Sequence, residues 1–178
     1  MRFNVAQLLK EPIGASRAYD TAEEGPALNE GGKRSFVQGD VSLLRLDRGI
    51  LVEGRLRLAV EEECSRCLEP FIQSVAIELQ EIYLPTIDIV TGLPLPIDRE
   101  SDAFYIGHNH EIDLTEAVRQ YGLLNTPLKF LCRPDCAGFC PGCGADLNRT
   151  TCRCVKEEEQ QMATVRVVAA GRQRRRTN

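Results

Sequence analysis

Eight cysteines in this 178-residue chain are its candidates for metal binding or redox reactions. They form four close pairs of the forms C-x2-C, C-x3-C, C-x2-C and C-x-C: Cys64, Cys67, Cys132, Cys136, Cys140, Cys143, Cys152 and Cys154. A C-x2-C turn folds two thiolates toward one tetrahedral point about 2.3 Å from each sulfur, which is the geometry that Zn²⁺ requires. The spacing therefore predicts metal binding, with one or two Zn²⁺ ions as the cofactor.

A disulfide interpretation of the same cysteines requires an oxidising compartment. The first residues, MRFNVAQLLKEPIG, show no basic segment followed by an apolar one and no cleavage site, both of which a secretory signal would have. No apolar run approaches the length of about eighteen residues that a membrane span needs. We therefore expect a cytoplasmic protein, in which thiols stay reduced and paired cysteines bind metal.

The spacing leaves two partitions of the cysteines open. In the first, the last four cysteines share one four-ligand site and the first four share another. In the second, a single site takes four of the last six cysteines, and Cys64 and Cys67 stay a reduced pair. Iron–sulfur clusters also use four thiolates, but neither ferredoxin spacing is present, so zinc is favoured. Each Zn²⁺ with four thiolates would add a net charge of about −2 to a chain whose formal charge is −4.

The composition is that of an ordinary globular chain without a catalytic motif. Hydrophobic residues make up 43% of the chain and charged residues 27%, which suits one folded core. The phosphate-binding loop, the dinucleotide-type glycine motif, H-E-x-x-H and G-x-S-x-G are all absent. A catalytic zinc keeps an open position, whereas four thiolates close the metal off from substrate. We therefore predict that the protein is not an enzyme.

Alternating apolar and polar residues predict three strands of an antiparallel sheet with one buried and one solvated face. These strands cover about residues 35–46, 52–61 and 71–83. The C-x2-C of Cys64 and Cys67 then sits at the turn between the second and third strands, where a metal would clamp it.

The segments outside these strands complete the prediction of the fold class. Residues 21–32, TAEEGPALNEGG, are expected to form a loop. A short strand at about 103–106 precedes a helix that Asp113 caps, with Glu116 completing a capping box. The predicted class is α+β: an antiparallel β-sheet, one principal helix and a small cysteine-rich, zinc-bound C-terminal module.

The same observations divide the chain into three parts. We expect a sheet domain that carries the first C-x2-C knuckle, a metal module packed on it, and a charged, flexible tail. These parts cover residues 1–131, 132–156 and 157–178. The tail holds an acidic run at 157–159 and the basic end RQRRRTN, for which plain solvation is the favoured interpretation.

Four motifs give the chain a family resemblance. They are FNVAQLLKEPIG near the start, CSRCLEPF (Cys64 to Phe71), EIDLTEAV (Glu111 to Val118), and LNTPLKFLCRPDCAGFCPGCGADLN (Leu124 to Asn148) with its trailing CRC. With these motifs the chain resembles the large ribosomal RNA subunit accumulation proteins, the YceD-like family. The resemblance implies a non-enzymatic factor in large-subunit (23S) ribosomal RNA accumulation or processing, and so in ribosome biogenesis. Some relatives keep a counterpart of the first cysteine pair but lack most of the others, which weakens the two-site partition.

Two kinds of partner fit this expectation: ribosomal RNA, or a large-subunit ribosomal protein or assembly factor. Cationic residues around the knuckles are the candidate contacts: Arg66, Lys129, Arg133, Arg149 and Arg153. The net negative charge fits a basic protein partner better than direct RNA binding. Neither a membrane nor a small-molecule substrate is expected.

Two other functions stay open at the level of sequence. One is a zinc-stabilised protein-interaction adaptor without a role in ribosomal RNA. The other is a thiol-based redox switch, in which the metal leaves on oxidation and the pairs become disulfides.

Overall fold

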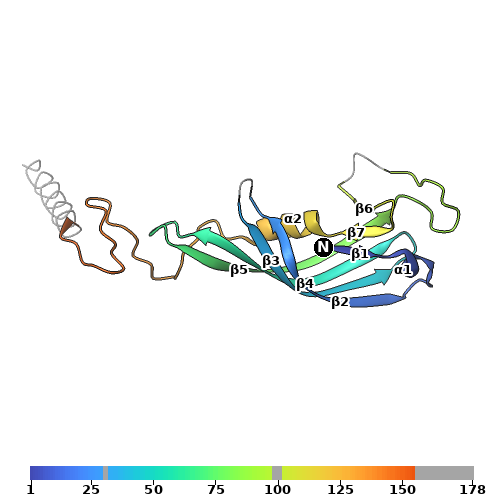
Figure 1. Ribbon diagram of the computed structural model, residues 1–178, viewed down its shortest axis with the longest axis horizontal. Helices are drawn as coiled ribbons and strands as arrows, with labels where there is room; N and C mark the ends of the chain where they lie inside the picture. Colours follow the sequence, from blue (N-terminus) through green and yellow to red (C-terminus); the bar gives the residue numbers. More distant parts are fainter. Residues whose placement is uncertain (30–31, 98–101, 155–178) are drawn as a thin grey trace, which may run out of the picture. The chain divides into compact units, whose positions relative to one another are not determined.

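The computed structural model describes residues 1–29, 32–97 and 102–154 (Figure 1). The chain forms two compact units. The first contains Met1–Glu62 and Ile72–Leu128, and the second contains Glu63–Phe71 and Lys129–Asn178. The second unit is thus built from two separate stretches of sequence, and all eight cysteines belong to it. The acidic run and the basic end of the expected tail lie outside the described residues.

A five-stranded sheet dominates the first unit. Its strands, in their order across the sheet, are β2 (Ser16–Ala27), β3 (Arg34–Arg45), β4 (Ile50–Glu63), β5 (Pro70–Pro85) and β6 (Phe104–Ile106). The pairs β2–β3 and β3–β4 are antiparallel, and Asp40 stands opposite both Asp20 and Arg55. β6 joins β5 in parallel, so the sheet is mixed at this edge. The predicted α+β class is confirmed, with that parallel strand as an addition.

Side-chain alternation explains why β4 and β5 form where they do. Val52, Leu56 and Leu58 of β4 are buried, whereas Glu53 and Arg55 between them are exposed. The buried residues of β5 follow the same period of two: Val75, Ile77, Leu79 and Tyr83. This pattern places the buried apolar side chains of both strands on one face of the sheet, while Ile72 and Ile82 of β5 stay exposed. Both predicted strands are confirmed, and each runs further than the pattern indicated.

The loop predicted over residues 21–32 is wrong, because β2 continues to Ala27. β2 is an edge strand whose backbone pairs with β3 as far as Ala27 opposite Arg34. An edge strand tolerates Pro26, since one side of its backbone needs no partner strand. The register also shifts between Glu24 and Ala27, which accommodates the Gly-Pro step. Pairing with β3 therefore overrides the turn preference of this sequence.

Two helices cover the buried face of the sheet. α1 (Ala6–Lys10) and α2 (Thr115–Asn125) place their buried apolar residues in one core cluster with those of β3, β4 and β5. Gly122 of α2 packs so closely that an added Cβ would lie 2.6 Å from a methyl group of Leu28. A second, two-stranded sheet pairs β1 (Arg2–Asn4) with β7 (Glu111–Asp113). No helix within the described ranges is long and apolar enough to cross a membrane.

The start of α2 differs from the predicted capping box. The side chain of Asp113 accepts a hydrogen bond from the N–H of Thr115 at 2.9 Å, but Leu114 holds the N-cap position. Glu116 does not reach back to the cap, because its carboxylate accepts hydrogen bonds from Arg119 one turn later. Hydrogen bonding to Arg119 lowers the pKa of Glu116 to about 2. An ion pair on the helix surface thus replaces the expected box.

Candidate metal centres

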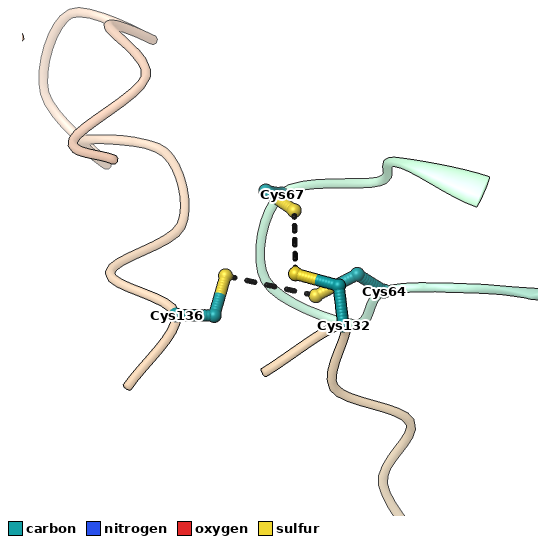
Figure 2. A group of neighbouring side chains, drawn as sticks. All are labelled: Cys64, Cys67, Cys132 and Cys136. Carbon is teal, nitrogen blue, oxygen red and sulfur yellow. Dashed lines mark hydrogen bonds between the residues drawn. The ribbon is translucent and has the colours of Figure 1, made fainter. Parts of the chain in front are cut away.

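The first group of cysteines lies where two distant stretches of the chain meet. β4 ends at Glu63 and β5 begins at Pro70, so Cys64 and Cys67 occupy the turn between them, as predicted. Cys132 and Cys136 come from the segment that follows α2. Figure 2 shows the four side chains pointing toward one another, with Cys64 facing Cys136 and Cys67 facing Cys132. We call this group the first centre.

The sulfur separations in the first centre match a tetrahedral metal site. Both facing pairs of sulfurs are 3.7 Å apart, and all four sulfurs lie within 4.8 Å of one another. Four sulfurs about 2.3 Å from a central Zn²⁺ form a tetrahedron with edges of about 3.8 Å. A disulfide would bring two sulfurs to about 2.05 Å, and all eight cysteines are free thiols. The first centre can therefore hold a metal ion with its sulfurs close to where they are.

Apolar side chains seal the first centre. Cys64, Cys67 and Cys136 are buried and Cys132 is partly buried. Phe71 and Leu131 pack against them and form an apolar cluster distinct from the core of the sheet. Such a shell controls the access of water to a metal site. A metal held here would be shielded from exchange with solvent.

The second centre consists of the remaining four cysteines, Cys140, Cys143, Cys152 and Cys154, whose sulfurs also lie within 4.8 Å of one another. The Cys152 sulfur is 3.2 Å from that of Cys140 and 3.6 Å from that of Cys143. Cys140 is buried, but Cys143 is exposed. The structure thus brings together the two sets of four that the two-site partition named. The second centre offers the same four sulfur ligands as the first centre, but they are more exposed to solvent.

The two C-x2-C turns share one backbone geometry. The N–H of Leu68 donates to the carbonyl oxygen of Cys64 at 2.9 Å, and the N–H of Gly144 donates to that of Cys140 at 2.8 Å. In each turn the N–H of the first cysteine donates to the carbonyl oxygen five residues later, at 3.0 and 2.8 Å. Leu68 and Gly144 both have positive φ, 56° and 71°. The chain therefore contains the same C-x2-C turn twice.

Backbone N–H groups point at the first sulfur of each turn. The N–H of Cys132, together with N–H groups within the turn, lowers the pKa of Cys64 to about 6. N–H groups of Cys143 and Gly142 also face the sulfur of Cys140, but the neighbouring Cys152 thiol and burial leave the pKa of Cys140 raised overall. These hydrogen bonds favour the thiolate, which is the form that binds metal. Burial raises the pKa of Cys132 to about 12, and a bound cation would supply the charge that ionises it.

Arg66 ties the first turn to the segment between the two centres. Its guanidinium donates to the carbonyl oxygen of Cys136 at 2.6 Å, and its own carbonyl oxygen accepts from the N–H of Phe139 at 3.1 Å. Gly138 lies against it, since a Cβ at this position would be 2.7 Å from the Arg66 carbonyl oxygen. Arg66 therefore has a structural role in the second unit. Its role as an RNA or partner contact stays a prediction.

The other cationic candidates fall into two kinds. Arg133 and Arg149 each pair with a nearby carboxylate, at 3.6 and 3.2 Å. Lys129 and Arg153 are exposed and pair with no carboxylate among the described residues. Lys129 and Arg153 are thus the two whose charge is available to a partner.

Asn148 is a residue of this region to which the sequence assigned no role. Its side-chain amide donates toward the Cys136 sulfur at 3.6 Å, although Asn148 lies among the residues of the second centre. Sequence spacing carries no sign of this contact, because it depends on how the segment folds back. Its place in the family-like stretch GCGADLN was the one available signal.

The fold and the two cysteine groups place the chain among small, cysteine-rich α+β proteins whose thiols could hold metal ions. The chain belongs to the family described as "Large ribosomal RNA subunit accumulation protein YceD", whose family model matches residues 52–166. The matched stretch contains most of β4, all of β5 and α2, and both centres. The resemblance inferred from the four motifs is confirmed.

Curated relatives agree with this membership. An uncharacterized protein of Mycobacterium tuberculosis is 28% identical over 156 residues, which cover 83% of this chain and 70% of the relative. A Zea mays protein named "Large ribosomal RNA subunit accumulation protein YCED homolog 1, chloroplastic" is 27% identical over 90% of this chain and 63% of its own length. A protein of the same name from Arabidopsis thaliana is 25% identical over 70% of this chain and 46% of its length. No solved structure matches the chain.

Proposed function

We propose that this protein is a non-enzymatic factor in the accumulation or processing of large-subunit (23S) ribosomal RNA, and so in ribosome biogenesis. The observation that carries the proposal is the family match over residues 52–166. Two plant relatives support it, since both are named large ribosomal RNA subunit accumulation proteins. Those relatives are named as chloroplastic, whereas for this chain we propose the cytoplasm, where thiols stay reduced.

Zinc is the proposed metal of both centres, at two ions per chain, with all eight cysteines as ligands. The 3.2 to 3.7 Å sulfur separations support it, because they lie near the edge of about 3.8 Å expected for zinc with four thiolates. Four thiolates fill the coordination sphere, so the metal has no open position for a substrate. In so small a unit the metal-binding energy is folding energy, and the proposed role of both ions is structural.

The cationic residues that face solvent are the proposed partner contacts. Lys129 and Arg153 are favoured, since Arg66, Arg133 and Arg149 already bond within the second unit. The partner is ribosomal RNA, or a basic large-subunit ribosomal protein or assembly factor that responds to the net charge of −4. The division of the chain at residues 131 and 156 into a sheet domain, a metal module and a tail stays a prediction.

Deletion of the gene tests the role in ribosomal RNA. We expect the deletion strain to hold less mature large-subunit RNA, relative to small-subunit RNA, and more of its precursor. A plasmid copy of the wild-type gene should restore both levels, which excludes an effect on neighbouring genes. Unchanged precursor and mature levels in the deletion strain would contradict the proposal.

Capture of partners from lysate, with and without nuclease, tests the proposed contacts. Large-subunit components should co-purify with the wild-type protein. The charge-reversed variant Lys129→Glu/Arg153→Glu should lose an RNA contact, should keep or strengthen a contact with a basic protein, and should keep its metal. Partners that persist after nuclease treatment identify a protein contact, and partners that disappear identify RNA. Partners that are not ribosomal under either condition would instead support the adaptor function.

A further inference from the structure

Asn148 links the two centres through its side-chain amide. Its oxygen Oδ1 accepts a hydrogen bond from the backbone N–H of Ala137 at 2.8 Å and another from the guanidinium of Arg133 at 2.7 Å. Both donors belong to the stretch that carries Cys136 of the first centre. In the sequence, however, Asn148 lies between Cys143 and Cys152 of the second centre. The Asn148 side chain therefore comes from the sequence of the second centre and bonds to the stretch that carries the first.

The two donors fix which end of the amide faces the sulfur. An oxygen can accept from two N–H groups, whereas an amide nitrogen has no free lone pair for either. The amide nitrogen Nδ2 must therefore point the other way, where it lies 3.6 Å from the Cys136 sulfur and 3.0 Å from Oδ1 of Asp146. All the hydrogen-bonding capacity of this side chain is thus engaged in one network.

The ends of the segment that carries Asn148 are held by the second centre, while its middle also bonds to the stretch of the first centre, where the N–H of Leu147 donates to the carbonyl oxygen of Gly138 at 2.8 Å. The N–H of Cys140 donates to the carbonyl oxygen of Ala145 at 2.8 Å, which starts the segment from the second metal-binding turn. Asp146 then accepts from the N–H of Asn148 at 2.9 Å and from the N–H of Thr150 at 2.9 Å. The segment returns to the second centre at Cys152. A metal ion in the second centre would therefore hold the two ends of this segment close together.

An N–H group directed at a metal-bound sulfur stabilises the thiolate and fixes the orientation of its side chain. Removal of such an outer contact typically costs 10 to 100-fold in metal affinity. Without metal in the second centre, residues 145–151 would lose order and Asn148 would move away from Cys136. The metal affinity of the first centre would then fall in the same way. The affinity of the first centre for metal then depends on whether the second centre is occupied.

We propose that Asn148 couples the two centres, so that metal in the second centre tightens metal binding in the first. This inference rests on the proposed metal binding of both groups. Because coupling between two binding sites is reciprocal, metal in the first centre tightens binding in the second by the same factor. The two centres then load as a cooperative pair, although no cysteine is shared.

Metal titration of four full-length proteins tests the coupling. They are the wild type, Asn148→Ala, the variant Cys143→Ser/Cys154→Ser that disables the second centre, and the combination of all three changes. Zn²⁺ is added in competition with a chromophoric chelator, and the cysteine ¹³Cβ shifts report which centre is loaded. We expect the disabled second centre to lower first-centre affinity about 10-fold when Asn148 is present, and to leave it unchanged when position 148 is Ala.

An equal loss with and without Asn148 would overturn the proposal, and so would no loss in either pair. A wild-type protein that binds no Zn²⁺ would instead overturn the metal assignment itself. The variant Asn148→Asp serves if a multiple variant fails to fold, because it keeps the Oδ1 acceptor and loses the N–H donor to Cys136. It should load its two centres without cooperativity, and wild-type cooperativity in it would also overturn the coupling. The matched control is Thr151→Ala, an exposed residue of the same segment, which should behave as wild type.

Discussion

Leu68 and Gly144 occupy the same position in two matching turns, directly after the second cysteine of each pair. Both have a left-handed backbone, with φ of 56° and 71°. Glycine adopts this conformation freely, whereas a residue with a Cβ pays roughly 1 to 2 kcal/mol for it. The side chain of Leu68 is 63% exposed and recovers little of that cost by packing. The first turn therefore carries a backbone strain that the second turn lacks.

Replacing Leu68 with Gly should stabilise the zinc-loaded second unit. The substitution removes the strain of the left-handed backbone at position 68. Glycine also gives the unfolded chain more conformational freedom, which offsets part of this gain, so the net stabilisation is about 0.5 to 1 kcal/mol. Urea titration followed by zinc release measures the effect. The reverse change, Gly144→Ala, is the matched control. It should destabilise by about 1 kcal/mol from the left-handed backbone alone, since an added Cβ at 144 would meet no atom within 4 Å and so causes no clash. A destabilised Leu68→Gly would show that Leu68 makes a contact that outweighs its strain.

Gly138→Ala should be far more harmful than Gly144→Ala, although both glycines have φ of 71°. A Cβ at 138 would lie 2.7 Å from the Arg66 carbonyl oxygen, and backbone there cannot move aside cheaply. Because Arg66 also bonds to Cys136, the displacement reaches the first centre. We expect a loss of 3 kcal/mol or more, on the order of strain and clash combined, and weaker zinc retention by the first centre. Chelator-driven zinc release from both variants measures this. Similar release from the two would contradict the close approach of Gly138 to Arg66.

Metal content should separate the two centres. Purified wild-type protein is expected to carry two zinc ions, one for each four-cysteine group, and Cys143→Ser should carry one. Cys64→Ser should also lose an ion, and it should expose Phe71 and Leu131, which pack around the buried first centre. Native mass spectrometry counts the ions, and a hydrophobic dye reports the exposure. Iron in place of zinc, or one ion in the wild type, would contradict the assignment.

Tyr83 should make stability sensitive to alkaline pH. Its hydroxyl donates to the Asp113 carbonyl oxygen at 3.3 Å, and burial raises the pKa of this phenol above its ordinary value. The unfolded chain therefore releases this proton first, at about pH 10, so stability falls above that pH by about 1.4 kcal/mol per unit. Tyr83→Phe should lose about 1 kcal/mol at pH 7 and should resist alkali better than the wild type. Parallel stability curves for the two proteins up to pH 11 would contradict this account.

Much of the fold was predictable because the strand signal is local. Val52, Leu56 and Leu58 alternate with charged residues, and this pattern alone places β4 and its buried face. β2 was missed because its residues are poor strand formers and its backbone bonds come from β3, a neighbour that only the fold supplies. The parallel pairing of Tyr83 with Phe104 also joins residues too far apart in sequence for local patterns to register.

The cysteine sulfurs of the candidate site could be predicted from the sequence, but the turns and contacts that support them could not. Cysteine spacing named every sulfur, because close pairs are what a tetrahedral ion requires. Spacing could not reveal that CSRC adopts the same turn as CPGC, since it lacks the glycine that marks the second turn at Gly144. Nor could it reveal the contact of Asn148 with Cys136, which depends on the path of residues 144–150.

The two centres also differ in how much chain must exist before they can form. The facing cysteines of the first centre are 65 and 72 positions apart in sequence, whereas those of the second are 9 and 12 positions apart. Domains form as the chain leaves the ribosome, from the N-terminus onward. The first pair of thiols must therefore wait, exposed on the β4–β5 turn, until Cys136 has been made. A chain that stops earlier keeps two thiols without partners, so zinc in the first centre marks a chain that has been translated past β5, β6, β7 and α2.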